Sequence, residues 1–86
     1  MKPVTLYGTD WCPFCVRAEQ LLTRKGITFE KINIAIAPGL REEMVHKSGG
    51  RRSVPQIFIG ETHVGGFDDL AELDRQGRLD ALLSAL

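Results

Sequence analysis

Residues 4–7 alternate between apolar and polar positions, and Gly8 follows them. This period of two predicts a short β-strand that ends at Gly8. Pro13 then suits the first turn of a helix, on which apolar residues recur along one face: Cys15, Ala18, Leu21 and Leu22. Gly26 is expected to stop this helix in the left-handed conformation that helices often use at their ends.

The rest of the chain predicts three more strands and three more helices. A strand is expected at 28–34, followed by a helix that Pro38 opens and Gly49-Gly50 ends. The nearly continuous apolar run 55–59 is typical of a strand near the middle of a sheet, and a tight turn at Gly60-Glu61 leads it into 62–64 as a hairpin. Helices around 68–75 and 78–86 finish the chain, the last with an apolar stripe of Leu79, Leu82, Leu83 and Leu86.

The resulting order, β-α-β-α-β-β-α-α, predicts an α/β fold. A βαβ unit followed by a β-hairpin implies a four-stranded mixed sheet with helices on both faces. A chain of 86 residues has the size of a single domain, and we expect that domain to span 1–86.

Composition places the chain among soluble globular proteins, with 43% hydrophobic and 26% charged residues. No stretch approaches the roughly 20 apolar residues that span a bilayer, and the N-terminal apolar run is too short for a secretory signal. We therefore expect a cytoplasmic protein without a membrane partner. A formal net charge of zero argues against nucleic-acid binding. Most basic residues lie within 1–60, an asymmetry that suits a zwitterionic ligand or equally reflects solvated helix faces.

Both cysteines lie in the segment Cys12-Pro13-Phe14-Cys15, where the first strand leads into the first helix. A disulfide across so short a loop removes little unfolded-chain entropy, which disfavours a structural role. Cys12 falls at the helix N-cap, where unpaired N–H groups and the helix dipole favour the reactive thiolate. Cys15 lies one turn further, facing the sheet and within disulfide reach. We therefore expect Cys12 to attack a substrate disulfide and Cys15 to resolve the intermediate.

Two observations qualify this interpretation. Asp10 places a carboxylate near Cys12 and opposes the thiolate, unless the fold brings Arg17 and Arg51 close enough to offset it. A structural zinc site is an alternative for the cysteines, but the separation of His46 and His63 does not resemble that of a zinc-finger pair. Redox chemistry without a metal is therefore favoured.

Three motifs occur in order along the chain: Cys12-Pro13-Phe14-Cys15, Ser53-Val54-Pro55 and Gly65-Gly66-Phe67-Asp68-Asp69. In this spacing they resemble dithiol glutaredoxins, particularly the small bacterial ones. The resemblance covers essentially the whole chain and implies a thioredoxin fold. It also implies a monomeric enzyme that reduces protein–glutathione mixed disulfides and protein disulfides, with glutathione as the reductant. Ribonucleotide reductase is a candidate protein partner.

The resemblance further implies a set of glutathione contacts: Phe14, Arg51, Val54, Pro55, Gly66, Phe67, Asp68 and Asp69. A cis Val54–Pro55 bond would turn the Val54 backbone toward Cys12 and the cysteinyl backbone of glutathione, although Pro55 taken alone suits an ordinary strand start. N–H groups around Phe67 and Asp68 would bind the γ-glutamyl carboxylate, and Asp68 or Asp69 the ammonium. The same acidic pair also suits a plain helix cap. Arg51, or less favourably Arg52, would meet the glycyl carboxylate.

Three residues depart from the family pattern. Thr9 stands where lysine is frequent, Phe14 where tyrosine is commoner, and Ser53 where threonine is usual. These changes bear on affinity and leave the reaction class unchanged. Trp11 precedes the nucleophile and is expected either to face protein substrates or to cover the helix start.

Two alternative functions remain open at this point. In one, two chains share a [2Fe–2S] cluster through Cys12 and bound glutathione. In the other, a redoxin of similar size is recharged by thioredoxin reductase. Pro13 and a resolving Cys15 favour the redox role over the cluster, and the motif at 65–69 favours glutathione over thioredoxin reductase.

Overall fold

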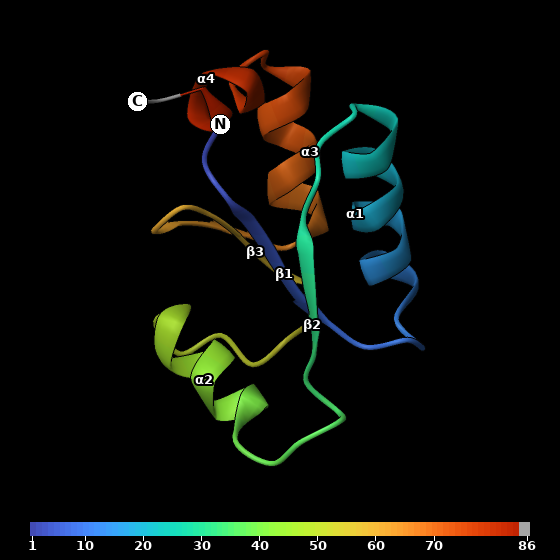
Figure 1. Ribbon diagram of the computed structural model, residues 1–86, viewed down its shortest axis with the longest axis vertical. Helices are drawn as coiled ribbons and strands as arrows, with labels where there is room; N and C mark the ends of the chain where they lie inside the picture. The colour runs from blue at the N-terminus through green and yellow to red at the C-terminus, as the bar shows by residue number, and fades with distance from the viewer. Residues whose placement is uncertain (85–86) are drawn as a thin grey trace.

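A four-stranded sheet forms the centre of the computed structural model, which describes residues 1–84 (Figure 1). The strands are β1 (Val4–Gly8), β2 (Glu30–Asn33), β3 (Gln56–Ile59) and β4 (Thr62–Gly65), in the spatial order β2-β1-β3-β4. β1 pairs parallel with β2 and antiparallel with β3, and β4 pairs antiparallel with β3. The predicted mixed sheet is therefore confirmed, with β3 between two neighbours.

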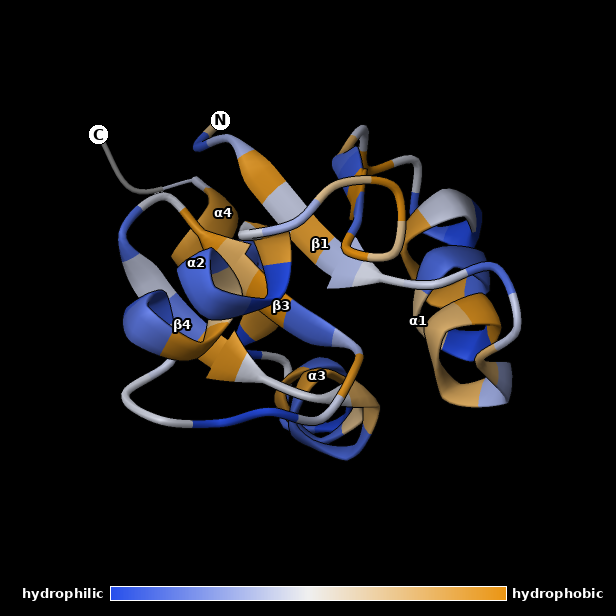
Figure 2. Ribbon diagram, turned by 90° about the horizontal axis from the view of Figure 1, so that it is seen from below, coloured by the Kyte–Doolittle hydropathy of each residue, from blue (hydrophilic) through white to orange (hydrophobic). Residues whose placement is uncertain are grey.

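Helices cover both faces of this sheet. The helices are α1 (Pro13–Arg24), α2 (Leu40–Lys47), α3 (Phe67–Arg75) and α4 (Leu79–Leu83). α1 and α3 pack together on one face, and α2 lies on the other; seen from below, β1 runs between α2 and α1 (Figure 2). None of the helices within residues 1–84 combines the length and the apolar character needed to cross a membrane.

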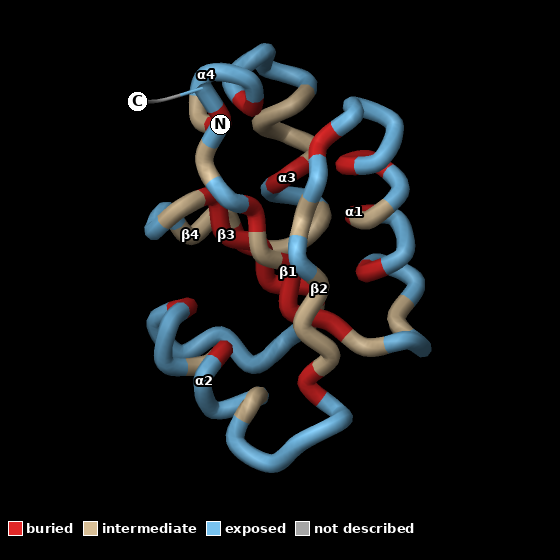
Figure 3. Tube along the Cα trace, in the orientation of Figure 1, coloured by how far each residue is buried: buried red, intermediate tan, exposed pale blue. Residues whose placement is uncertain are grey.

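The two central strands contribute to a core on each face. Leu6 and Ile57 pack with α1 and α3, whereas Tyr7 and Phe58 face α2 with their rings edge to face at 5.7 Å. Figure 3 shows the buried positions concentrated along β1 and β3. Because β3 is covered on both faces, all four of its residues are buried, which explains the apolar run in the sequence.

Several element boundaries differ from the predictions by a few residues. The second strand is shorter than 28–34, since Asn33 Oδ1 accepts a hydrogen bond from the Ala35 N–H (2.9 Å) and turns the chain away. α2 begins at Leu40, because Gly39 adopts a positive φ of 92° and leaves Pro38 in the preceding turn. α3 begins one residue before the expected 68. Of the helix expected at 78–86, residues 79–83 are confirmed, and Leu86 lies outside the described residues.

Candidate active site

Cys12 is the N-cap residue of α1, as its position in the sequence predicts. Its backbone is extended, with φ −106° and ψ 109°, while its carbonyl already accepts the first helical hydrogen bond from the Val16 N–H (3.0 Å). The Cys15 N–H points back at the Cys12 sulfur, 3.1 Å away. The sulfur therefore occupies the place of a capping oxygen, where a backbone donor stabilises negative charge on it.

The second cysteine is enclosed by the fold. Cys15 is fully buried, whereas Cys12 is partly exposed, and both are free thiols. Burial first, and then its hydrogen bond with Cys12, raise the pKa of the Cys15 thiol to about 12. Cys15 therefore stays protonated at neutral pH, and Cys12 is the sulfur that solvent reaches.

This difference predicts selective labelling of the reduced protein. Iodoacetamide at pH 7.5 should alkylate Cys12 alone in the native state and both cysteines in denaturant, because only the thiolate reacts and Cys15 is inaccessible. Mass spectrometry of the digested protein identifies the labelled site. Labelling of both sites at similar rates in the native protein would contradict the assignment.

Gly8 leaves the space that the Cys15 side chain occupies. A Cβ at Gly8 would lie 2.9 Å from Cys15 Sγ and 3.2 Å from Leu6 Cδ2, and both of those residues are fully buried. We expect Gly8→Ala to lower the free energy of unfolding of the reduced protein by about 1–3 kcal/mol, measured by urea denaturation. In a Cys15→Ala background the sulfur is gone, so the loss should be smaller; an equal loss in both backgrounds would count against this contact.

On the other side of Cys12 lies the segment before β3. The Val54–Pro55 peptide bond is cis, as the resemblance implied, and the Cys12 thiol lies 3.6 Å from the Val54 carbonyl oxygen. A groove of about 140 Å³ begins here and is lined by Phe14, Arg51, Ser53, Val54, Pro55, Gly66, Phe67, Asp68 and Asp69. The structure thus brings together all eight residues expected to contact glutathione, and adds Ser53.

Aromatic side chains form one wall of this groove. The rings of Phe14 and Phe67 lie 6.3 Å apart, and the Arg17 guanidinium lies 5.1 Å from the centre of the Phe14 ring. Trp11 is 82% exposed and Val16 is 44% exposed, so apolar surface continues around Cys12. Of the two roles expected for Trp11, its exposure favours contact with a partner over cover for the helix.

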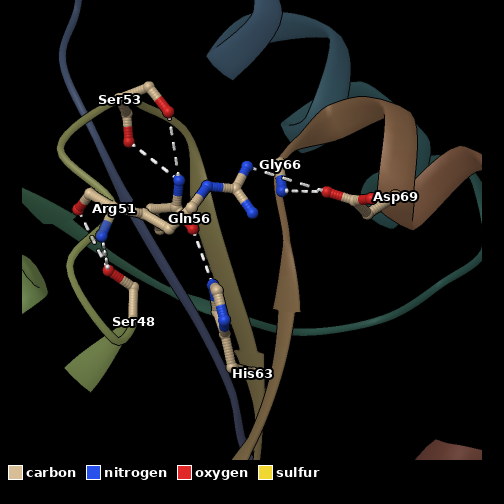
Figure 4. Close-up of polar contacts among 7 residues, drawn as sticks. All are labelled: Ser48, Arg51, Ser53, Gln56, His63, Gly66 and Asp69. Atoms are coloured by element: carbon tan, nitrogen blue, oxygen red, sulfur yellow. Dashed lines mark hydrogen bonds and ion pairs between the residues drawn. The ribbon is translucent and has the colours of Figure 1, made fainter.

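The start of α3 also contributes two aspartates to the groove, and Figure 4 shows the contacts of Asp69. The Gly66 N–H donates to Asp69 Oδ2 (2.9 Å), and Arg51 Nη2 lies 3.9 Å from the same oxygen. Ser48 holds the Arg51 backbone, because its Oγ accepts from the Arg51 N–H (3.1 Å) and donates to the Arg51 carbonyl (3.0 Å). Asp69 is therefore engaged in capping α3, and both aspartates are exposed and line the groove.

The cation beside Asp10 is Lys31. Its Nζ lies 3.0 Å from Asp10 Oδ1 and 3.3 Å from Glu19 Oε2, and Asn33 Nδ2 donates to Asp10 Oδ2 (3.2 Å). Arg17 and Arg51, which could have offset Asp10, contact Phe14 and Asp69 instead. Parallel pairing of β1 with β2 brings Lys31 to the site, a contact that no local sequence motif predicts.

Arg52, the weaker candidate for the glycyl carboxylate, lies outside the groove. Its guanidinium pairs with Glu42 of α2 at 3.3 Å, and its carbonyl accepts from Arg41 (2.7 Å). Within the described part of the chain, no three His, Cys, Asp or Glu side chains are grouped so that they could hold a metal ion.

Gln56 and His63 are polar residues beneath the groove that the motif analysis did not single out. Gln56 is fully buried, and its side-chain oxygen lies 2.7 Å from His63 Nε2. Burial lowers the pKa of His63, the Arg51 charge lowers it further, and Asp69 opposes them. The available signal was a glutamine inside an otherwise apolar strand, because such a residue needs a buried partner.

Known proteins are similar to this chain in both sequence and fold. The glutaredoxin family model matches residues 4–64. A glutaredoxin of Pseudomonas aeruginosa is 59% identical over 85 residues, covering 99% of this chain and 100% of the relative. Glutaredoxin 3 of Escherichia coli K12 is 48% identical over 83 residues, covering 96% and 99%.

Solved structures that are similar to this chain are glutaredoxins as well. The solution structure of a glutaredoxin from Brucella melitensis has 51% identity and a TM-score of 0.84, over 96% of this chain and 89% of that one. The crystal structure of a buckwheat glutaredoxin–glutathione complex has 27% identity and a TM-score of 0.87, over 96% and 77%. The fold is therefore the thioredoxin fold, and the chain belongs to the glutaredoxin family of thiol–disulfide oxidoreductases.

Proposed function

We propose that this protein uses glutathione to reduce protein–glutathione mixed disulfides and protein disulfides through Cys12 and Cys15. The observation that carries the proposal is a groove lined by Val54 and by the start of α3, with the Cys12 thiol 3.6 Å from the Val54 carbonyl oxygen. A tripeptide with a central sulfur, two carboxylates and an ammonium matches the chemistry along that groove.

Each part of glutathione has a suitable partner among the lining residues. The Val54 backbone is offered to the cysteinyl backbone, as in the addition of one strand residue. The Arg51 guanidinium suits the glycyl carboxylate, and the N–H groups of Phe67 and Asp68 suit the γ-glutamyl carboxylate. Asp68, exposed at the groove, suits the ammonium. Phe14 and Phe67 cover the apolar part of the ligand.

The reaction exchanges disulfides without net change in their number. The Cys12 thiolate attacks the glutathione sulfur of a protein mixed disulfide; the Cys12–glutathione bond forms and the protein thiol leaves. A second glutathione thiolate then attacks that glutathione sulfur, forms oxidised glutathione and releases Cys12. Alternatively, Cys15 attacks Cys12, forms the Cys12–Cys15 disulfide and releases reduced glutathione.

A coupled assay tests this function. Reduction of a mixed disulfide of glutathione with a small thiol is followed as NADPH consumption by glutathione reductase. We expect turnover that depends on both this protein and glutathione. Turnover with thioredoxin reductase but not with glutathione would overturn the proposal.

The two aspartates give a paired prediction. Asp68→Asn should raise the KM for the glutathione mixed disulfide a few-fold, since an exposed ion pair contributes about 0.2–1 kcal/mol, and should leave Tm unchanged. Asp69→Asn should lower the stability by about 1 kcal/mol, because it weakens the cap of α3. Kinetics and thermal denaturation of both variants separate the roles; identical behaviour of the two would contradict them.

A further inference from the structure

A short chain of polar side chains lies beneath the groove and joins β3 to β4 (Figure 4). Gln56 Nε2 donates to the Ser53 carbonyl (3.0 Å) and to Ser53 Oγ (3.3 Å). Gln56 Oε1 lies 2.7 Å from His63 Nε2. Gln56 is fully buried, so every polar atom of its amide requires a partner from within the protein.

These contacts determine which atoms carry hydrogens. A backbone carbonyl accepts hydrogen bonds and never donates, so the amide atom beside the Ser53 carbonyl must be the NH₂ group of Gln56. Gln56 Oε1 is then an acceptor, and His63 Nε2 must carry the hydrogen that it accepts. In its neutral form the His63 ring is therefore the Nε2–H tautomer, assigned here from the hydrogen-bond network.

The His63 ring has a second contact besides Gln56. It packs against Phe58 of β3 with ring centres 4.9 Å apart and planes 32° apart. Burial and the nearby charge of Arg51 keep the ring neutral, against the opposing effect of Asp69. A neutral, stacked imidazole presents one fixed donor, and that donor points at Gln56.

The segment that Gln56 holds, residues 53–56, is the one that faces Cys12. Ser53 immediately precedes Val54, whose carbonyl oxygen lies 3.6 Å from Cys12 Sγ, and Gln56 immediately follows Pro55. The Gln56 side chain therefore ties together both ends of the turn that presents Val54 to the groove. β4 continues from His63 to Gly65, and Gly66 then leads into the start of α3.

We propose that His63 and Gln56 are positioning residues for glutathione: the Nε2–H of His63 orients Gln56, and Gln56 holds Ser53 so that the Val54 backbone stays where the cysteinyl backbone pairs. This role rests on the proposed function, since it assumes that glutathione occupies the groove. Neither side chain lines the groove, so both act through Val54.

His63→Phe is the informative variant. Phenylalanine preserves a ring against Phe58 but removes the N–H donor, which leaves Gln56 Oε1 buried without a partner. We expect the KM for the glutathione mixed disulfide to rise about tenfold with kcat changed less than twofold, because an unpaired buried acceptor is costly and the turn can relax to relieve it. His63→Gln, whose amide can donate, should recover part of the loss. His46→Phe, at the exposed histidine of α2, is the matched control and should match wild type.

Two further measurements separate positioning from mere stability. Alkylation of Cys12 by iodoacetamide, which does not use the groove, should proceed at the wild-type rate in His63→Phe. Nitrogen NMR of the wild-type ring should show the Nε2–H tautomer, a test that requires no variant to fold. An Nδ1–H tautomer, an unchanged KM, or equal losses of kcat and alkylation rate would each overturn the positioning role. Absence of glutathione-dependent turnover in the wild type would instead overturn the proposed function, on which the positioning role rests.

Discussion

Replacing Cys12 by serine should abolish turnover of a glutathione mixed disulfide, while Cys15→Ser should remain within about tenfold of wild type, a change of at most 1.4 kcal/mol in the barrier. Cys12 is the accessible sulfur, capped by the Cys15 N–H, and a serine hydroxyl there is not ionised at neutral pH. Cys15 is dispensable because a second glutathione can resolve the intermediate. The coupled assay with purified variants gives both rates.

Mass spectrometry provides the control for this pair. Cys15→Ser incubated with oxidised glutathione should accumulate one glutathione adduct on Cys12, because the internal resolving thiol is missing. Cys12→Ser should form no stable adduct, since Cys15 is fully buried. An active Cys12→Ser, or an inactive Cys15→Ser that still folds, would reverse the roles assigned to the two sulfurs.

The parts of the fold that the sequence predicts well are those set by local pattern. The apolar run of β3 reflects burial on both faces, and Gly26, with φ 72°, ends α1 as expected. Boundaries were less predictable where two signals compete. Pro38 suits a helix start, but Gly39 beside it adopts a conformation that delays the helix to Leu40.

In the candidate site, too, the predictable features are those that depend on local sequence. Cys12 and most of the groove-lining residues come from short motifs: one at the strand–helix junction, one in the loop before β3 and one at the start of α3. The partners of charged and buried polar groups are not local. Lys31 reaches Asp10 through parallel strand pairing across 21 positions, and His63 reaches Gln56 only because β3 and β4 form a hairpin. Several basic residues were available for Asp10, and the register of the strands decides among them.

Gly65 links the backbone conformation to the groove, because it lies against Asp69, which lines the groove. Its φ of 119° is a region that side chains rarely adopt, and an added Cβ would overlap the Asp69 carboxylate, with Asp69 Cγ at 2.8 Å and Asp69 Cβ at 3.1 Å. That carboxylate accepts from the Gly66 N–H, so it cannot move away without opening the cap of α3.

Gly65→Ala should therefore cost about 3 kcal/mol in the free energy of unfolding, the combined effect of backbone strain and overlap. For a domain of this size, such a loss lowers Tm by roughly 15 °C.

Gly77→Ala is the matched control, because Gly77 also has a positive φ, 72°, but no atom lies within 4 Å of its added Cβ. Strain alone should cost about 1–2 kcal/mol there. If the two variants unfold at the same temperature, the overlap with Asp69 contributes nothing. If Gly65→Ala is the less stable and also binds glutathione more weakly at temperatures where it is folded, the cap of α3 supports both the stability of the fold and the binding groove.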